Sequence, residues 1–142
     1  MSETDAGTYF ELLRRDVRTL GVLAAAARNA NPPHDASDWV VTLHFYILCI
    51  YAKALGRCRG KEFQDHIGIR NWLNTESDLL AVAKSYRKTE EWSRDARYEG
   101  RIFDAEEIRN LHRWFRTARD IFVELLRGNA CQDVPVVEPV NP

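Results

Sequence analysis

The segment from Trp39 to Leu55, WVVTLHFYILCIYAKAL, constrains the fold most, because as a helix it would be apolar over nearly its whole circumference. A helix of this kind normally lies in the middle of a bundle, surrounded by others. Thr42, His44 and Lys53 interrupt the segment, and it falls short of the roughly 20 apolar residues that span a bilayer. The sequence therefore predicts a central core helix from about Ala36 to Gly56 and no membrane span.

Four other segments have the three-and-four spacing of apolar residues that lines one face of a helix. They run over about Gly7 to Asn29, Glu62 to Leu73, Glu76 to Arg94, and from an Asp104 cap to Gly128. In the last one, Asp104 and Glu107 have the spacing of a capping box. On the segment before it, Glu90 and Glu91 are predicted to lie on the solvated side. The pattern predicts an all-α, up-and-down bundle of about five helices.

The domain boundary is predicted where the helical spacing of apolar residues ends. Residues 1–128 are predicted to form a single helical bundle domain. The remaining residues, 129–142, contain three prolines and no periodicity. Such a terminal segment is typical of a disordered tail.

The overall charge and the cysteines limit the classes of function. The formal net charge is −1, so any nucleic-acid site has to be a local basic patch. The three cysteines, Cys49, Cys58 and Cys131, form no close pair in the sequence, which argues against a disulfide framework. The first ten residues are acidic and lack the apolar stretch of a secretory signal. A reducing cytoplasm is the predicted location.

Metal and cofactor chemistry find no support in the sequence. His44, His66 and His112 fall on three different predicted helices without an HExxH or Glu-x-x-His pattern, so no metal site is predicted. No glycine-rich phosphate loop is present, and no cofactor is predicted. His44 and Cys49 fall on the central helix, where a hydrogen-bonded core histidine and a small core cysteine are expected.

Basic residues gather at the end of the central helix: Lys53, Arg57, Arg59 and Lys61. His66 and Arg70 follow, four residues apart and so neighbours on a helix. Arginine beside histidine suits phosphodiester chemistry, since arginine neutralises the phosphate and histidine moves the proton of a ribose hydroxyl. The simpler interpretation is a solvated helix end, with Arg70 paired to an acidic residue elsewhere.

A second basic group, Arg94, Arg97 and Arg101, lies near the join of the last two predicted helices. Nearby acidic residues nearly balance its charge. Its predicted character is mainly that of a salt-bridged surface.

These segments together resemble HEPN domains. In that superfamily an aromatic-rich helix like Trp39 to Leu55 precedes a basic loop and a histidine, here His66. The segment Ser85-Tyr86-Arg87 and the later SRDARY, Ser93 to Tyr98, resemble another signature of the group, and the last helix fits its closing helix. The resemblance covers about Trp39 to Leu126.

The resemblance implies a helical bundle, usually a homodimer, of the kind found in toxin–antitoxin, phage-defence and RNA-processing systems. Catalytic members are metal-independent ribonucleases with an Arg-x(4–6)-His motif at the dimer interface. Arg59 and His66 have this spacing, but they lie at the loop after the central helix. Many relatives lack the catalytic pair and serve as binding or partner modules.

Three hypotheses follow. The first is an HEPN-like module that binds a nucleic acid, a nucleotide or a partner protein such as an antitoxin. The second is a metal-independent endoribonuclease using Arg59 and His66, helped by Arg70 or by Arg94 and Tyr98 across a dimer. The third is an unrelated helical adaptor. Candidate phosphate-binding residues are Lys53, Arg57, Lys61, Arg70, Arg94, Arg97 and Tyr98.

Overall fold

Helices account for nearly all the regular structure of the computed structural model, which describes residues 3–142, with side chains from Ala6 onward. The elements are α1 (Glu3–Asn29), α2 (Ser37–Cys58), α3 (His66–Leu73), the 3-10 turn η1 (Ser77–Leu79), α4 (Leu80–Glu99) and α5 (Ala105–Gly128). No strand occurs among the described residues, and the predicted all-α bundle of about five helices is confirmed. Met1 and Ser2, the start of the predicted domain, lie outside the described residues.

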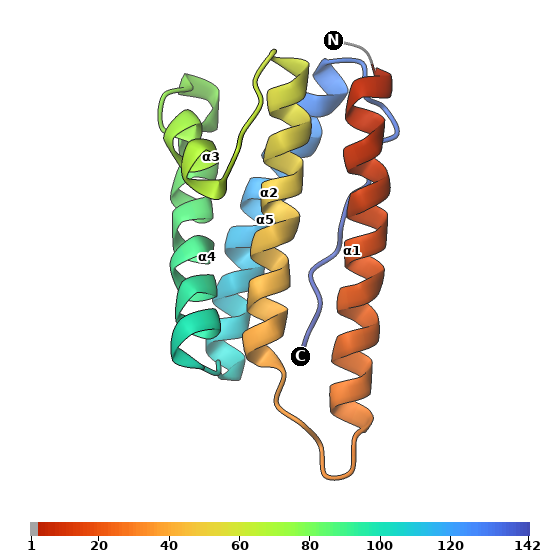
Figure 1. Cartoon of the computed structure of the whole chain (residues 1–142), viewed down its shortest axis with the longest axis vertical. Helices are drawn as coiled ribbons and strands as arrows, with labels where there is room; N and C mark the ends of the chain where they lie inside the picture. Colours follow the sequence, from red (N-terminus) through yellow and green to blue (C-terminus); the bar gives the residue numbers. More distant parts are fainter. Residues whose placement is uncertain (1–2) are drawn as a thin grey trace.

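Helix α2 occupies the centre of the bundle, as its apolar circumference predicts. Helices α1, α4 and α5 all pack against it (Figure 1). By length and composition α2 is apolar enough to cross a membrane, but 78% of its most apolar window is buried inside the bundle. This burial is compatible with the core helix of a soluble protein.

The helix ends determine where the basic residues lie. Asp104 accepts a hydrogen bond from the Glu107 amide at 2.8 Å while Glu107 accepts one from the Asp104 amide at 3.1 Å, so the predicted capping box is confirmed. Helix α3 begins at His66, later than the predicted Glu62, because the Asp65 side chain caps it by accepting from the Gly68 amide. Helix α4 continues past the predicted end at Arg94 to Glu99, where Gly100 terminates it in the left-handed conformation. Its last turn therefore includes Arg97 and Tyr98.

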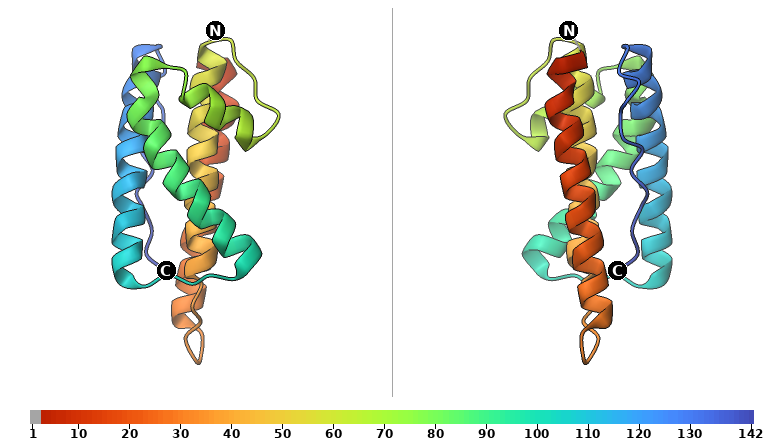
Figure 2. Two further views of the ribbon diagram at one scale, coloured as in Figure 1. Left: turned by 90° about the vertical axis from the view of Figure 1, so that its left-hand side faces the viewer. Right: turned by 90° about the vertical axis from the view of Figure 1, so that its right-hand side faces the viewer.

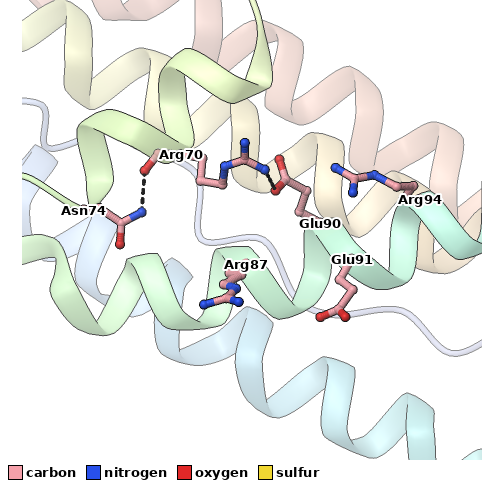
Figure 3. Close-up of a pocket in the computed structure, with 6 residues that line it drawn as sticks. All are labelled: Arg70, Asn74, Arg87, Glu90, Glu91 and Arg94. Carbon is pink, nitrogen blue, oxygen red and sulfur yellow. Dashed lines mark hydrogen bonds and ion pairs between the residues drawn. The ribbon is translucent and has the colours of Figure 1, made fainter.

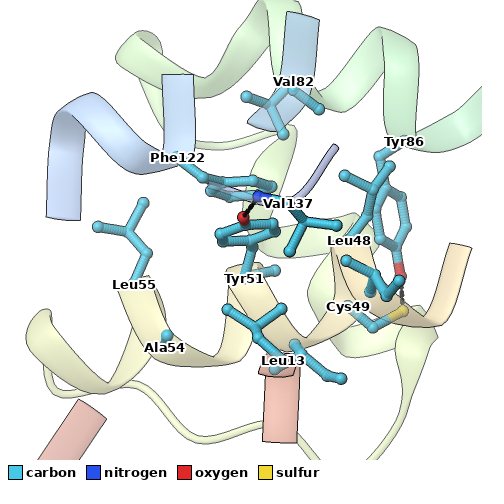
Figure 4. Packing of buried hydrophobic residues seen from close by; sticks show 14 of the residues in the cluster. Leu13, Leu48, Cys49, Tyr51, Ala54, Leu55, Val82, Tyr86, Phe122 and Val137 are labelled. Carbon is cyan, nitrogen blue, oxygen red and sulfur yellow. Dashed lines mark hydrogen bonds between the residues drawn. The ribbon is translucent and has the colours of Figure 1, made fainter. Parts of the chain in front are cut away.

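The C-terminal tail, residues 129–142, is packed on the bundle, and the prediction of a disordered tail is wrong. It runs as an extended strap between α1 and α5, antiparallel to α5 (Figures 1 and 2). Val134 and Val137 are buried, with exposed fractions of 4% and 3%. The Tyr51 hydroxyl donates a hydrogen bond to the Pro135 carbonyl at 2.5 Å. It also accepts one from the Val137 amide at 3.0 Å (Figure 4). The three prolines prevent a helix but do not prevent burial of Val134 and Val137.

Two histidines hold the end of the tail through Val140. His44 Nε2 accepts a hydrogen bond from the Val140 amide at 3.1 Å, and His44 Nδ1 lies 2.7 Å from the Val40 carbonyl oxygen. This arrangement requires a neutral imidazole that carries its proton on Nδ1. His112 Nε2 lies 3.0 Å from the Val140 carbonyl oxygen, to which it donates. The predicted hydrogen-bonded core histidine at position 44 is confirmed, and its partners are Val40 on α2 and Val140 in the tail.

The tail also brings two cysteines together. Cys131 is buried against the core, and its sulfur atom lies 3.9 Å from that of Cys58, a contact and not a bond. This proximity was not predicted, since the sequence places the two cysteines far apart and the tail was expected to be disordered.

Candidate anion-binding groove

The outer face of α4 carries a row of charged side chains. Lys84, Arg87, Lys88, Glu91 and Arg94 are all exposed and recur at steps of three and four residues. Residues with this spacing are neighbours on one face of a helix. Four cations therefore lie along one side of α4 with a single carboxylate among them.

This row borders a hollow between α3 and α4. A cavity of about 470 Å³ is lined by Arg70, Asn74, Arg87, Glu90, Glu91 and Arg94 (Figure 3). A second hollow of about 490 Å³ shares Asn74, Arg87 and Glu91 with the first and adds Lys84 and Lys88. We refer to the two hollows together as the α3–α4 groove.

Glu90 lies at the bottom of the α3–α4 groove, and its predicted place on the solvated side of α4 is wrong. The residue is only 3% exposed. Its Oε1 accepts a hydrogen bond from Arg70 Nη1 at 2.8 Å, while the buried Oε2 has no hydrogen-bond partner among the described residues. The simpler interpretation of Arg70, pairing with an acidic residue elsewhere, therefore holds. Arg70 lines the groove, but its charge is balanced by Glu90.

The other cations of the groove are not balanced in this way. Within residues 3–142, neither Arg87 nor Arg94 makes an ion pair or a side-chain hydrogen bond. The same holds, among the residues described, for Lys84 and Lys88. Glu91 is the one further carboxylate lining the two hollows. The groove therefore presents excess positive charge on a concave surface, which attracts anions.

Arg59 and His66, the predicted catalytic pair, lie next to different carboxylates. Both terminal nitrogens of Arg59 donate to the carboxylate of Asp78, at 3.1 and 2.6 Å. This pairing raises the pKa of Arg59 and lowers that of Asp78. His66 Nε2 instead lies 3.9 Å from Oε2 of the buried Glu90. The two side chains thus have separate acidic neighbours.

The predicted cluster at the end of α2 is largely outside the groove. Arg57 lies 3.0 Å from Glu62, and its guanidinium is 5.9 Å from the ring of Tyr9. Lys61 is exposed in the loop after α2, and Lys53 is half-buried on α2. None of the three lines either hollow of the groove.

The second predicted basic group divides in two. Arg101 pairs with Asp95 at 2.9 Å and with Glu107, as a salt-bridged surface predicts. Arg94 and Arg97 make no ion pair with the residues described. Arg97 instead lies against aromatic rings, with its guanidinium 5.3 Å from the ring of Tyr98. Only part of this group is therefore neutralised.

The buried nucleophile and bases belong to the core. Burial lowers the pKa of His44 to about 4 and raises the pKa of Cys49 to about 11, so both are neutral near pH 7. Among the described residues no three His, Cys, Asp or Glu side chains gather as metal ligands would. These groups act in packing and tail attachment.

The chain was compared with known protein families, curated proteins and solved structures. No protein-family model, curated protein or solved structure gave a significant match to the chain. The HEPN relationship therefore stays a prediction.

Sequence reasoning found some residues of the groove and missed others. Arg70 and Arg94 were among the predicted phosphate-binding residues, whereas Arg87 and the lysines of α4 were not. The signal for Glu90 was present, because it continues the apolar spacing of Val82, Ala83 and Tyr86 along α4. A carboxylate on a buried stripe predicts a cationic partner, here Arg70.

Proposed function

We propose that this chain is an HEPN-like helical module that binds RNA, or another nucleic acid, through the phosphates at the α3–α4 groove. The observation that carries the proposal is the pair Arg87 and Arg94, exposed one above the other on α4 with no carboxylate partner among the described residues. Lys84 and Lys88 extend the same positive face. Arginine guanidinium groups bind phosphate oxygens in a bidentate manner, and lysine adds charge without fixed geometry.

The shape and the charge of the groove favour a polyanion. The two hollows share residues, so the positive surface continues along α4 beyond the length of a single phosphate. The protein as a whole has a net charge of −1, so the affinity has to come from this local surface. Binding to phosphates releases counterions from the nucleic acid, and this release is less favourable at high salt. The affinity for a single strand therefore falls by about 0.7 of a power of the salt concentration per phosphate contact.

The test is the anisotropy of a fluorescein-labelled, mixed-sequence single-stranded RNA of 12 nucleotides, titrated with protein at low and physiological salt. Arg87→Glu/Arg94→Glu is expected to weaken binding at low salt by at least about a hundredfold, since each of the two lost charged hydrogen bonds contributes about 1.5–3 kcal/mol. The slope of affinity against salt is also expected to fall.

The matched control is Arg113→Glu/Arg116→Glu, which makes the same charge change on the exposed face of α5. This variant is expected to retain most of the affinity at physiological salt. Equal losses in the two double variants would mean that net charge alone governs binding, and the groove would have no special role.

A ribonuclease is the second candidate, and one observation favours it. His66 lies 3.9 Å from the buried carboxylate of Glu90, which would orient the imidazole as a general base. Arg59 is occupied by Asp78 in this structure, so a catalytic role would require it to change partners. The binding proposal therefore has the stronger support.

Incubation of the labelled RNA with the protein in EDTA separates these candidates. The binding proposal expects the RNA to stay intact over hours at protein concentrations that saturate it. Cleavage that disappears in both His66→Ala and Arg59→Ala would make the ribonuclease the better account. Cleavage that persists in both variants would come from another site or a contaminant.

The HEPN resemblance also bears on the oligomeric state and the partners of the protein. This resemblance supports a homodimer in the cytoplasm of a bacterium, acting with an antitoxin or another defence partner. An adaptor unrelated to HEPN domains would bind a protein at this surface and show no affinity for the RNA.

A further inference from the structure

The end of α4 crosses the beginning of α2 (Figure 2). A separate hollow lies between the two helices at this crossing. Its volume is about 410 Å³, within the range of small-molecule sites. The lining residues come from both helices and are Asp38, Trp39, Thr42, Ala96, Arg97 and Gly100. We call it the α2–α4 pocket.

An exposed tryptophan forms one wall of the α2–α4 pocket. Trp39 has an exposed fraction of 55%, although tryptophan is usually among the more buried residues. Tyr98 is 76% exposed at the end of α4, close to the same pocket through its contact with Arg97. Flat aromatic faces open to solvent beside a cation are the usual components of sites on which nucleobases stack.

Arg97 is fixed in place before any ligand arrives. Its Nε donates to the Ser93 carbonyl at 3.2 Å and its Nη1 donates to the Tyr46 hydroxyl at 3.1 Å. Its guanidinium carbon lies 5.6 Å from the ring centre of Tyr46 and 5.3 Å from that of Tyr98. No carboxylate of the described residues pairs with it, so a positioned charge remains for an anionic or π-rich ligand.

A carboxylate supplies a polar acceptor to the α2–α4 pocket. Asp38 Oδ1 accepts from the backbone amide of Trp39 at 2.9 Å. Its other oxygen, Oδ2, has no partner in the part of the chain that the structure describes. Nucleobases carry N–H donors on their edges, and carboxylates accept hydrogen bonds from them. The pocket therefore offers a ring to stack on, a fixed cation and a free acceptor.

The α2–α4 pocket adjoins the positive row of α4 through Arg97, which follows Arg94 by three residues and is its neighbour on the helix. Tyr98 follows Arg94 by four residues, so it is the next side chain along the row that begins at Lys84. From Arg87 to Arg97 the rise along the helix is about 15 Å. A strand whose phosphates lie against Arg87 and Arg94 would bring a nearby unpaired base to the α2–α4 pocket.

We propose that the α2–α4 pocket holds an unpaired base of a single-stranded nucleic acid, stacked on Trp39, while the α3–α4 groove holds the phosphates. This inference rests on the proposed function and adds to it the strandedness of the ligand. A duplex keeps its bases stacked inside and cannot fill the pocket, so the protein selects single strands.

The experiment compares three 12-nucleotide probes by anisotropy: the single-stranded RNA, the same sequence as a duplex, and an abasic ribose-phosphate strand. Wild-type protein is expected to bind the single strand roughly tenfold more tightly than the abasic strand, the effect of one stacked base. Trp39→Ala is expected to remove this preference and to bind both strands equally. Trp39→Phe, which keeps a ring, is expected to retain part of it.

Intrinsic fluorescence provides a second measurement. Trp39 is the most exposed of the four tryptophans, so stacking of a base is expected to quench the emission of wild-type protein and not that of Trp39→Phe. Circular dichroism is the check that each variant is folded. We expect both to fold, because the Trp39 side chain is largely exposed.

The possible failures are distinguishable. Wild-type protein that binds none of the probes would overturn both the groove and the pocket. Binding that the groove variant abolishes, with the same preference for the single strand in Trp39→Ala as in wild type, would overturn the pocket alone. A dimer that dissociates on Trp39→Ala in sedimentation would identify this surface as a protein interface instead.

Discussion

A chain that ends at Ala130 is expected to be less stable than the full protein by about 3 kcal/mol or more, because the tail covers part of the core. Val134 and Val137 are buried, and burial of each valine contributes about 1.5–3 kcal/mol. The two hydrogen bonds between Tyr51 and the tail add to this, while the entropy lost in ordering the tail offsets part of it. Urea denaturation is the measurement, and both the midpoint and the slope are expected to fall.

A point substitution separates burial from chain length. Val137→Asp places a charge where the side chain is 3% exposed, whereas the adjacent Val136 is 44% exposed. Val137→Asp is expected to approach the effect of truncation, since a buried unpaired charge is strongly unfavourable. Val136→Asp, the matched control, is expected to change stability by less than about 0.5 kcal/mol. Equal stability of the wild-type protein, Val137→Asp and Val136→Asp would show that the tail does not pack on the bundle in solution.

The protein is also expected to lose stability as the pH falls from 6.5 toward 4, through His44. Burial lowers the pKa of this residue to about 4, below the value of about 6.5 for an exposed histidine. The unfolded chain therefore binds a proton in this window that the folded protein does not, and acid favours unfolding. For His44 alone the loss between pH 7.5 and pH 5 is about 2 kcal/mol. Burial also lowers the pKa of His112, which acts in the same direction.

Denaturation midpoints at pH 5 and pH 7.5 test this expectation. In His44→Gln the difference between the two midpoints is expected to shrink, although the variant is less stable at both. His34→Gln, on an exposed residue, is the control and is expected to keep the wild-type difference. A wild-type midpoint that is the same at both pH values would contradict a neutral His44 holding the Val140 amide.

The helices were predictable because the local sequence signals for helix formation agree with the packing that the structure shows. Asp104 and Glu107 have the spacing of a capping box and form one, and the apolar circumference of α2 matches its central position. The start of α3 was misplaced, since Asp65 caps the helix without a distinctive apolar pattern around it. The tail was missed for a different reason. Val134 and Val137 of the tail are buried against the helices although the tail itself is extended. The helical spacing of apolar residues gives no signal for burial of this kind.

The groove was predictable only in part, because its chemistry depends on pairing across helices. Arg70 and Arg94 were singled out from clustering alone, but their environments differ. Arg70 is paired with Glu90 of another helix, whereas Arg94 has no carboxylate partner among the described residues. Clustering in sequence does not show which cation is neutralised. The α2–α4 pocket joins Trp39 and Arg97, two residues far apart in the chain, and only the crossing of the helices brings them together.

The most direct test of the central claim is to map the RNA contact by amide chemical shifts. The ¹⁵N-labelled protein is titrated with the single-stranded 12-nucleotide RNA, and the shifted amides are located in the sequence. The account predicts that the largest shifts fall on residues 84–98 of α4 and around Arg70 of α3, with the Trp39 indole signal moving as well. Shifts concentrated on α1 or on the outer face of α5, with α4 unchanged, would contradict it.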